Sequence, residues 1–140
     1  MKKLTFLLAL SLFIQYASAQ TEKPKPPAEI AASDGLTDDE RSKKEVREKL
    51  EAIRQRVLKG ESMSALATLY SEDPGSAKAG GVYRDVPRGM MVPEFEAAAF
   101  KLDVGALSEV FETQYGFHFV QLIARKGETI DVRHILLKFK

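Results

Sequence analysis

Hydrophobic residues recur at helical spacing in two stretches of the first half of the chain. In the first stretch they lie three or four positions apart and share one helix face: Val46, Leu50, Ile53 and Val57. Thr37 and Glu40 fit the reciprocal capping pattern that begins a helix, and Gly60 can adopt the left-handed conformation that ends one. A second, shorter helix is predicted after Ser62, with these residues facing inward: Met63, Leu66, Ala67 and Tyr70.

The second half of the chain contains short runs of β-branched and aromatic residues between turn residues, a pattern typical of strands. The predicted strands are Val82–Val86, Ser108–Thr113, Phe117–Ile123 and Ile130–Phe139. Pro93 is well placed at the first position of a helix that runs to Phe100. This order predicts a mixed α+β domain, with the helices gathered on one part of a small antiparallel sheet.

Composition limits the chain to one globular core. A chain of 140 residues, 44% hydrophobic and 29% charged, is too short for two ordinary domains. The net charge is +1, and without Lys2 and Lys3 the remaining 19 basic and 20 acidic side chains leave −1. We therefore expect no nucleic-acid partner. The lack of cysteine excludes disulfides, Cys-ligated metal and an acylated lipoprotein cysteine.

Residues 1–19 have the three-part pattern of a secretory signal peptide. Lys2 and Lys3 precede a mostly apolar run from Leu4 to Ile14, and Ala17-Ser18-Ala19 supplies the small residues of a cleavage site. The apolar run is too short to remain as a membrane anchor. The mature protein is expected to be secreted or periplasmic, with no membrane anchor after cleavage.

Residues 20–36 contain the run Lys23-Pro24-Lys25-Pro26-Pro27 and almost no large apolar side chains. Such a segment favours extended, solvated backbone and is interpreted as a Pro-rich linker. The folded domain is then expected to span residues 37–140.

Three motifs follow one another between Asp73 and His118. They are Asp73-Pro74-Gly75-Ser76-Ala77-Lys78-Ala79-Gly80-Gly81, then Arg88-Gly89-Met90-Met91-Val92-Pro93-Glu94-Phe95, then Thr113-Gln114-Tyr115-Gly116-Phe117-His118. In order and spacing they resemble the parvulins, the rotamase type of peptidyl-prolyl isomerase, and within them the exported SurA/PrsA-like branch. The resemblance implies a four-stranded antiparallel sheet with surrounding helices, and an isomerase that needs no cofactor or metal.

The resemblance also implies roles for individual residues. Those expected to contact the substrate proline are Met91, Phe95, Phe100 and Tyr83. Those expected to form a polar, hydrogen-bonded floor are His118, His134, Asp73 and Thr113. Tyr83 replaces a pocket leucine of the family and is expected to narrow the pocket. On the residues alone, plainer interpretations stand beside these: core packing for Met91 and Phe95, structural histidines, and a turn cap for Asp73.

One part of the family pattern is out of place. Parvulins open with a strand that carries a motif like Arg-His-Ile-Leu-x-Lys, and here no histidine precedes the first predicted helix. The motif stands instead at the end, as Val132-Arg133-His134-Ile135-Leu136-Leu137-Lys138. Residues 130–140 would be the stub of a second repeat, a strand exchanged in a strand-swapped dimer, or the displaced first strand folded back as a hairpin.

Hairpin geometry favours the last alternative. A three-residue connection at Arg125-Lys126-Gly127, with Gly127 in the left-handed position, would pair His118 with His134. A slip of one residue would send His134 to the opposite face of the sheet. The C-terminal segment is therefore predicted to supply the missing strand.

These patterns predict an exported peptidyl-prolyl cis/trans isomerase whose partners are proline-containing unfolded or partly folded polypeptides. The basic loop of phosphate-directed parvulins has no counterpart, so no preference for phosphorylated substrates is expected. Two other functions stay open: a catalytically weak peptide-binding or chaperone module, and a truncated piece of a tandem parvulin.

Overall fold

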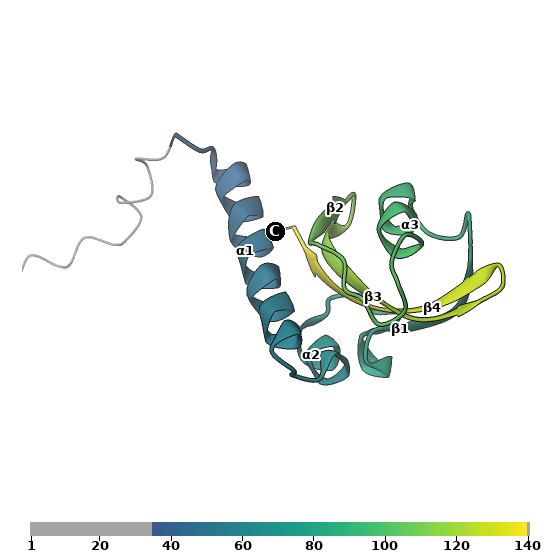
Figure 1. Cartoon of the computed structure of the whole chain (residues 1–140). Helices are drawn as coiled ribbons and strands as arrows, with labels where there is room; N and C mark the ends of the chain where they lie inside the picture. The colour runs from purple at the N-terminus through teal and green to yellow at the C-terminus, as the bar shows by residue number, and fades with distance from the viewer. Residues whose placement is uncertain (1–34, 140) are drawn as a thin grey trace, which may run out of the picture. The chain divides into compact units, whose positions relative to one another are not determined.

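A four-stranded antiparallel sheet in the order β1-β4-β3-β2 forms the centre of the protein (Figure 1). Its strands are β1 (Val82–Pro87), β2 (Phe111–Thr113), β3 (Gly116–Lys126) and β4 (Thr129–Lys138). The helical elements are α1 (Asp38–Leu58), α2 (Met63–Tyr70), η3 (Ala77–Ala79, a 3-10 turn) and α3 (Pro93–Ala99). This computed structural model describes residues 35–139, so the predicted signal peptide and nearly all of the predicted linker lie outside the described residues.

The three predicted helices are present in the structure, and each begins at the local sequence signal that predicted it. The Thr37 hydroxyl accepts a bond from the Glu40 N–H at 3.2 Å, and the Glu40 carboxylate accepts from the Thr37 N–H at 2.8 Å. The Ser62 hydroxyl accepts from the Ala65 N–H at the start of α2. Pro93 is the first residue of α3. Within residues 35–139, no helix combines the length and hydrophobicity needed to cross a membrane.

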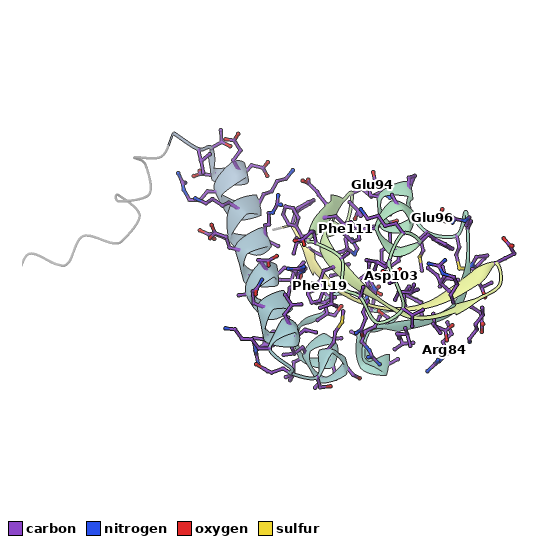
Figure 2. The ribbon with its side chains drawn as sticks, viewed as in Figure 1. Arg84, Glu94, Glu96, Asp103, Phe111 and Phe119 are labelled. Carbon is purple, nitrogen blue, oxygen red and sulfur yellow. The ribbon has the colours of Figure 1, made fainter. Side chains whose placement is uncertain are left out.

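Helices cover both faces of the sheet, whereas the sequence predicted them on one part of it. One hydrophobic cluster joins α1 and α2 to the sheet: Val46, Leu50, Ile53, Met63, Leu66, Ala67, Val110, Phe117, Phe119, Ile135 and Leu137. The other joins α3 to the opposite face: Val86, Phe95, Ala98, Ala99, Val120, Leu122, Ile130 and Val132. Figure 2 shows Phe119 of the first cluster and Phe111, which packs against the second. Both faces of β3 and β4 are apolar, so each face must be buried from water by other elements of the chain.

The C-terminal segment forms β4, which pairs with β3 on one side and β1 on the other. The predicted hairpin is therefore present within the chain. Its connection is the two-residue turn Gly127-Glu128, closed by the pair of Lys126 with Thr129, and Gly127 has a φ of 58°. The predicted strand from Ser108 is shorter than expected, since β2 begins at Phe111.

The register of the hairpin lies two residues from the predicted one, so that prediction was wrong. His118 pairs with Leu136, and Val120 pairs with His134. A shift of two residues leaves each side chain on its face, because side chains alternate with a period of two. His118 and His134 are thus diagonal neighbours on the α3 side of the sheet.

A bulge at Ile123 sets this arrangement. Near the turn Ala124 pairs with Asp131, but farther along Leu122 pairs with Val132, which leaves Ile123 as an extra residue in β3. If the pairing fixed by the turn continued without this shift, His134 would oppose Gln121. The two imidazoles would then lie on opposite faces of the sheet.

Candidate active site

A cavity of about 380 Å³ lies on the α3 side of the sheet, a size typical of sites for small ligands. Its lining comes from the turn after α2, from β1, from α3 and the loop before it, from the turn between β2 and β3, and from the central strands: Asp73, Pro74, Tyr83, Met90, Met91, Val92, Phe95, Tyr115, His118, His134, Leu136 and Lys138. Met90 and Tyr115 are more than half exposed, whereas His118 and His134 are each only 4% exposed. The cavity therefore combines an apolar wall with a buried polar floor.

The structure places most of the predicted substrate-binding residues in this wall. Met91, Phe95 and Tyr83 line the cavity. Phe100 does not, because it is the C-cap of α3 and lies about 140° around the helix axis from Phe95. Its ring instead receives the Arg88 guanidinium, 4.1 Å from the ring centroid. The prediction that Phe100 lies near the proline pocket is not supported by this placement.

All four predicted polar residues meet in one hydrogen-bonded chain. Thr113 Oγ1 lies 2.7 Å from His118 Nε2. His118 Nδ1 lies 3.4 Å from His134 Nδ1. His134 Nε2 lies 2.9 Å from Asp73 Oδ2. The predicted contact of the two histidines is confirmed, although they are diagonal neighbours and not a directly opposed pair.

For two neutral imidazoles, the order of protons along the chain follows from the carboxylate at one end. A carboxylate only accepts hydrogen bonds, so His134 must donate from Nε2 to Asp73 and, as a neutral ring, accept at Nδ1. His118 then donates from Nδ1 and accepts at Nε2. The Thr113 hydroxyl then donates to this nitrogen, and its oxygen also accepts the Tyr115 N–H at 3.1 Å. In this order each of the three bonds has one donor and one acceptor, and both rings are neutral.

Asp73 is held by donors from three elements. Oδ2 accepts the His134 N–H, the Ser76 hydroxyl at 2.5 Å and the Tyr83 hydroxyl at 2.7 Å. The hydrogen bond from His134 is the largest cause that holds the pKa of Asp73 well below its usual range, against the opposing effect of burial. Asp73 is therefore ionised at neutral pH. The sequence reasoning missed Ser76, although its position three residues after Asp73 in a turn was a usable signal.

Aromatic rings enclose the histidine pair. The Phe95 ring meets both imidazoles edge to face, with centroids 6.0 Å from His118 and 5.3 Å from His134. Phe111, in β2, stacks on His118 with a centroid distance of 5.4 Å. Burial, together with the nearby His134, lowers the pKa of His118 to about 4. Phe111 was also missed from the sequence, because its contact depends on the pairing of β2 with β3.

In the part of the chain that the structure describes, no three His, Asp or Glu side chains converge in a way that would hold a metal ion. His118 and His134 use their ring nitrogens within the hydrogen-bonded chain. The arrangement is thus suited to binding and orienting a ligand in the cavity above a hydrogen-bonded polar floor.

Residues 27–124 match the rotamase family, described as the PPIC-type PPIASE domain. The chain belongs to this family. The matched segment includes Asp73, Thr113 and His118 but ends before β4, so His134 lies outside it.

Two relatives illustrate the similarity. The chain is 44% identical over 104 residues to foldase protein PrsA 4 of Bacillus cereus, covering 74% of this chain and 33% of that protein. It is 43% identical over 89 residues to chaperone SurA of Nitrosococcus oceani, covering 64% of this chain and 21% of that protein. The chain therefore spans a third or less of the length of these relatives.

A crystal structure of the peptidylprolyl isomerase PrsA from Bacillus cereus has a similar fold. The TM-score is 0.56 at 43% identity, over 59% of this chain and 32% of that one. The parvulin-like α+β fold predicted from the sequence is confirmed.

The lowered pKa of His118 predicts a specific loss of stability in mild acid. The folded protein resists protonation of this ring until about pH 4, whereas the unfolded chain takes up the proton near pH 6.5. Unfolding is therefore favoured as the pH falls from 6.5 toward 4, by on the order of 2 kcal/mol. Urea unfolding at pH 7 and pH 5 measures this loss.

His118→Gln is the matched control, because glutamine keeps hydrogen-bonding groups and does not titrate. The variant is expected to lose less stability than wild type between pH 7 and pH 5. An equal loss in both proteins would contradict the assignment of this pH dependence to His118.

Proposed function

We propose that the chain is an exported peptidyl-prolyl cis/trans isomerase that acts on proline-containing segments of unfolded or partly folded polypeptides. One observation carries the proposal: the chain of bonds from Thr113 through both histidines to Asp73 lies directly beneath an apolar cavity. The family to which the chain belongs supports it. The relatives' names, foldase and chaperone, support unfolded polypeptides as substrates.

Isomerisation of a prolyl bond breaks no covalent bond, and its barrier of about 18–20 kcal/mol reflects the amide resonance that is lost as the C–N bond twists. A catalyst must therefore bind the twisted amide more tightly than either planar form. The planar amide has more charge separation than the twisted one, so exclusion of water favours twisting. Phe95 and Met91 would hold the proline ring in such an apolar setting.

The polar floor would keep a fixed shape without transferring a proton. His118 is neutral at pH 7, since its pKa is about 4. Each nitrogen of the two rings has a partner, so neither imidazole is free to rotate toward the substrate. Binding and orientation, and not acid–base chemistry, would then account for the rate.

Export is part of the proposal on sequence grounds. Residues 1–19 have the pattern of a secretory signal peptide, which includes a charged start, an apolar run and small residues at the cleavage site. Cleavage after Ala19 would release a mature chain that begins at Gln20. The periplasm or the outside of the cell would then be the place where the isomerase meets its substrates.

A peptide-binding module without useful turnover is the second candidate. Tyr83 favours it, because this residue stands where the family pattern has a smaller leucine and its ring lines the cavity. A narrower cavity would bind a proline ring yet hinder the rotation of the amide. Measuring turnover and binding on the same peptide separates the two functions.

We expect the full chain to accelerate cis/trans exchange of an Ala-Pro peptide, measured by NMR exchange spectroscopy. Phe95→Ala and His118→Ala should each lower kcat/KM about tenfold or more, because one removes the wall and the other breaks the floor. Leu69→Ala is the matched control, since Leu69 is 71% exposed on α2 and does not line the cavity. Peptide binding without accelerated exchange by the wild type would rule out the enzyme.

We also expect no gain from a phosphoserine before the proline. Among the residues that line the cavity, Lys138 is the one lysine or arginine, and the negative charge of Asp73 offsets its positive charge. A phosphate with nearly two negative charges usually requires a cluster of basic groups. Ser-Pro and phosphoserine-Pro peptides should give kcat/KM values within about threefold of each other, and a large gain with phosphate would contradict this.

A further inference from the structure

Tyr83 lies where the cavity and the hydrogen-bonded chain meet. Its ring lines the cavity and lies 5.5 Å from the His134 ring, centroid to centroid, at an interplanar angle of 35°. Its hydroxyl donates to Asp73 Oδ2 at 2.7 Å. The same residue thus contacts the space for the substrate, one histidine and the carboxylate that orients that histidine.

Strand β1 fixes this position. Tyr83 pairs with Val132, two residues before His134 on β4, so the two side chains share a face. The ladder is then interrupted by a bulge at Arg84 and Asp85, where Asp85 has a φ of 52°. The buried carboxylate of Asp131 accepts the Asp85 N–H at 2.9 Å and so holds the bulge.

The carboxylate of Asp73 accepts hydrogen bonds from two hydroxyl groups as well as from His134. The Ser76 side chain is buried, with 1% of its surface exposed, and Tyr83 approaches from the cavity. A Cβ on Gly75 would lie 2.4 Å from the Tyr83 hydroxyl oxygen, so the hydroxyl fits closely against the turn that carries Asp73. Burial, with a contribution from Asp73, raises the pKa of Tyr83 to about 12, so the phenol remains a donor.

We propose that Tyr83 is a positioning residue for this site: its hydroxyl takes up part of the negative charge of Asp73 and thereby keeps the His118–His134 pair neutral and in one order of hydrogen bonds. The effect on turnover rests on the proposed isomerase function. The effect on the histidines does not depend on it.

The reason is electrostatic. A carboxylate with fewer donors attracts a proton to the adjacent imidazole more strongly, because hydrogen bonds to its oxygens disperse its charge. A protonated His134 would carry N–H groups at both nitrogens and would aim one of them at the Nδ1–H of His118, 3.4 Å away. To keep this bond, the proton of His118 would have to move from Nδ1 to Nε2 and the Thr113 oxygen would have to accept it, so the order of hydrogen bonds along the chain would reverse.

The ionisable groups around His134 come from several elements. Asp73 lies in the turn after α2, Tyr83 in β1 and His118 in β3, and each of these contacts His134 directly. Lys138, on β4, lines the same cavity. From α3 the facing side chain is the uncharged Phe95. Asp73 is thus the anionic partner of His134 in the described residues, and Tyr83 the donor to it from the cavity side.

Tyr83→Phe removes the hydroxyl and keeps the ring. In NMR titrations of the full chain, the wild-type histidines should show His134 with its proton on Nε2 and His118 with its proton on Nδ1. Tyr83→Phe should raise the pH at which the pair takes up its first proton by roughly half to one unit. In exchange spectroscopy, the kcat of the variant should begin to fall at a higher pH than that of the wild type as the solution is made more acidic, with KM nearly unchanged.

Three further variants make the result specific. Tyr70→Phe is the matched control, because the Tyr70 hydroxyl accepts from Arg56, away from the cavity. Ser76→Ala removes the other hydroxyl donor and should shift the titration in the same direction. In an Asp73→Asn background, Tyr83→Phe should produce no additional shift, because the charge through which the hydroxyl acts is gone.

Tyr83→Phe with wild-type titration and tautomers would overturn the inference, as would an equal shift in Tyr70→Phe. A shift that persists in the Asp73→Asn background would also overturn it. If the wild type does not accelerate exchange, the proposed function fails, while the titrations still decide the role of Tyr83.

Discussion

The pairing of β4 between β3 and β1 is the constraint on which the rest of the structure depends. It brings His134, from the last part of the chain, beside His118 and within 2.9 Å of Asp73. It also supplies hydrophobic residues to the clusters on both faces of the sheet. The two-residue turn alone would put the histidines on opposite faces, and the bulge at Ile123 restores them to one face. The site therefore exists because a local irregularity corrects the register that the turn imposes.

Burial of the polar floor is tolerated because its groups are satisfied by one another. Buried polar groups without partners are costly, whereas a complete network can be buried and gives a unique arrangement. Here the network has a carboxylate at one end and a hydroxyl at the other, and for two neutral rings the carboxylate fixes the tautomer of each histidine. The floor consequently has a fixed arrangement, and the apolar wall from α3 and the preceding loop faces it across the cavity. An arrangement of this kind suits a reaction that needs shape and low polarity more than proton transfer.

Much of the fold was predictable because its signals are local. The caps at Thr37 and Ser62 and the proline at the start of α3 act within one helical turn, so the helix bounds followed from the sequence. The C-terminal strand and the meeting of its histidine with His118 also followed, since side-chain alternation survives a shift of two residues. The register did not follow, because the choice between a two-residue and a three-residue connection depends on packing across the whole hairpin. Phe111 escaped notice for a related reason: its contact with His118 joins strands that only the folded sheet brings together.

The most direct test of this account is to end the chain after Glu128, which removes β4, and to compare its urea unfolding with that of the full chain. The account predicts loss of the cooperative transition, because β1 and β3 would lose the backbone hydrogen bonds that they make to β4, and both hydrophobic clusters would lose residues. A truncated protein that unfolds cooperatively with the free energy of unfolding of the full chain would contradict it.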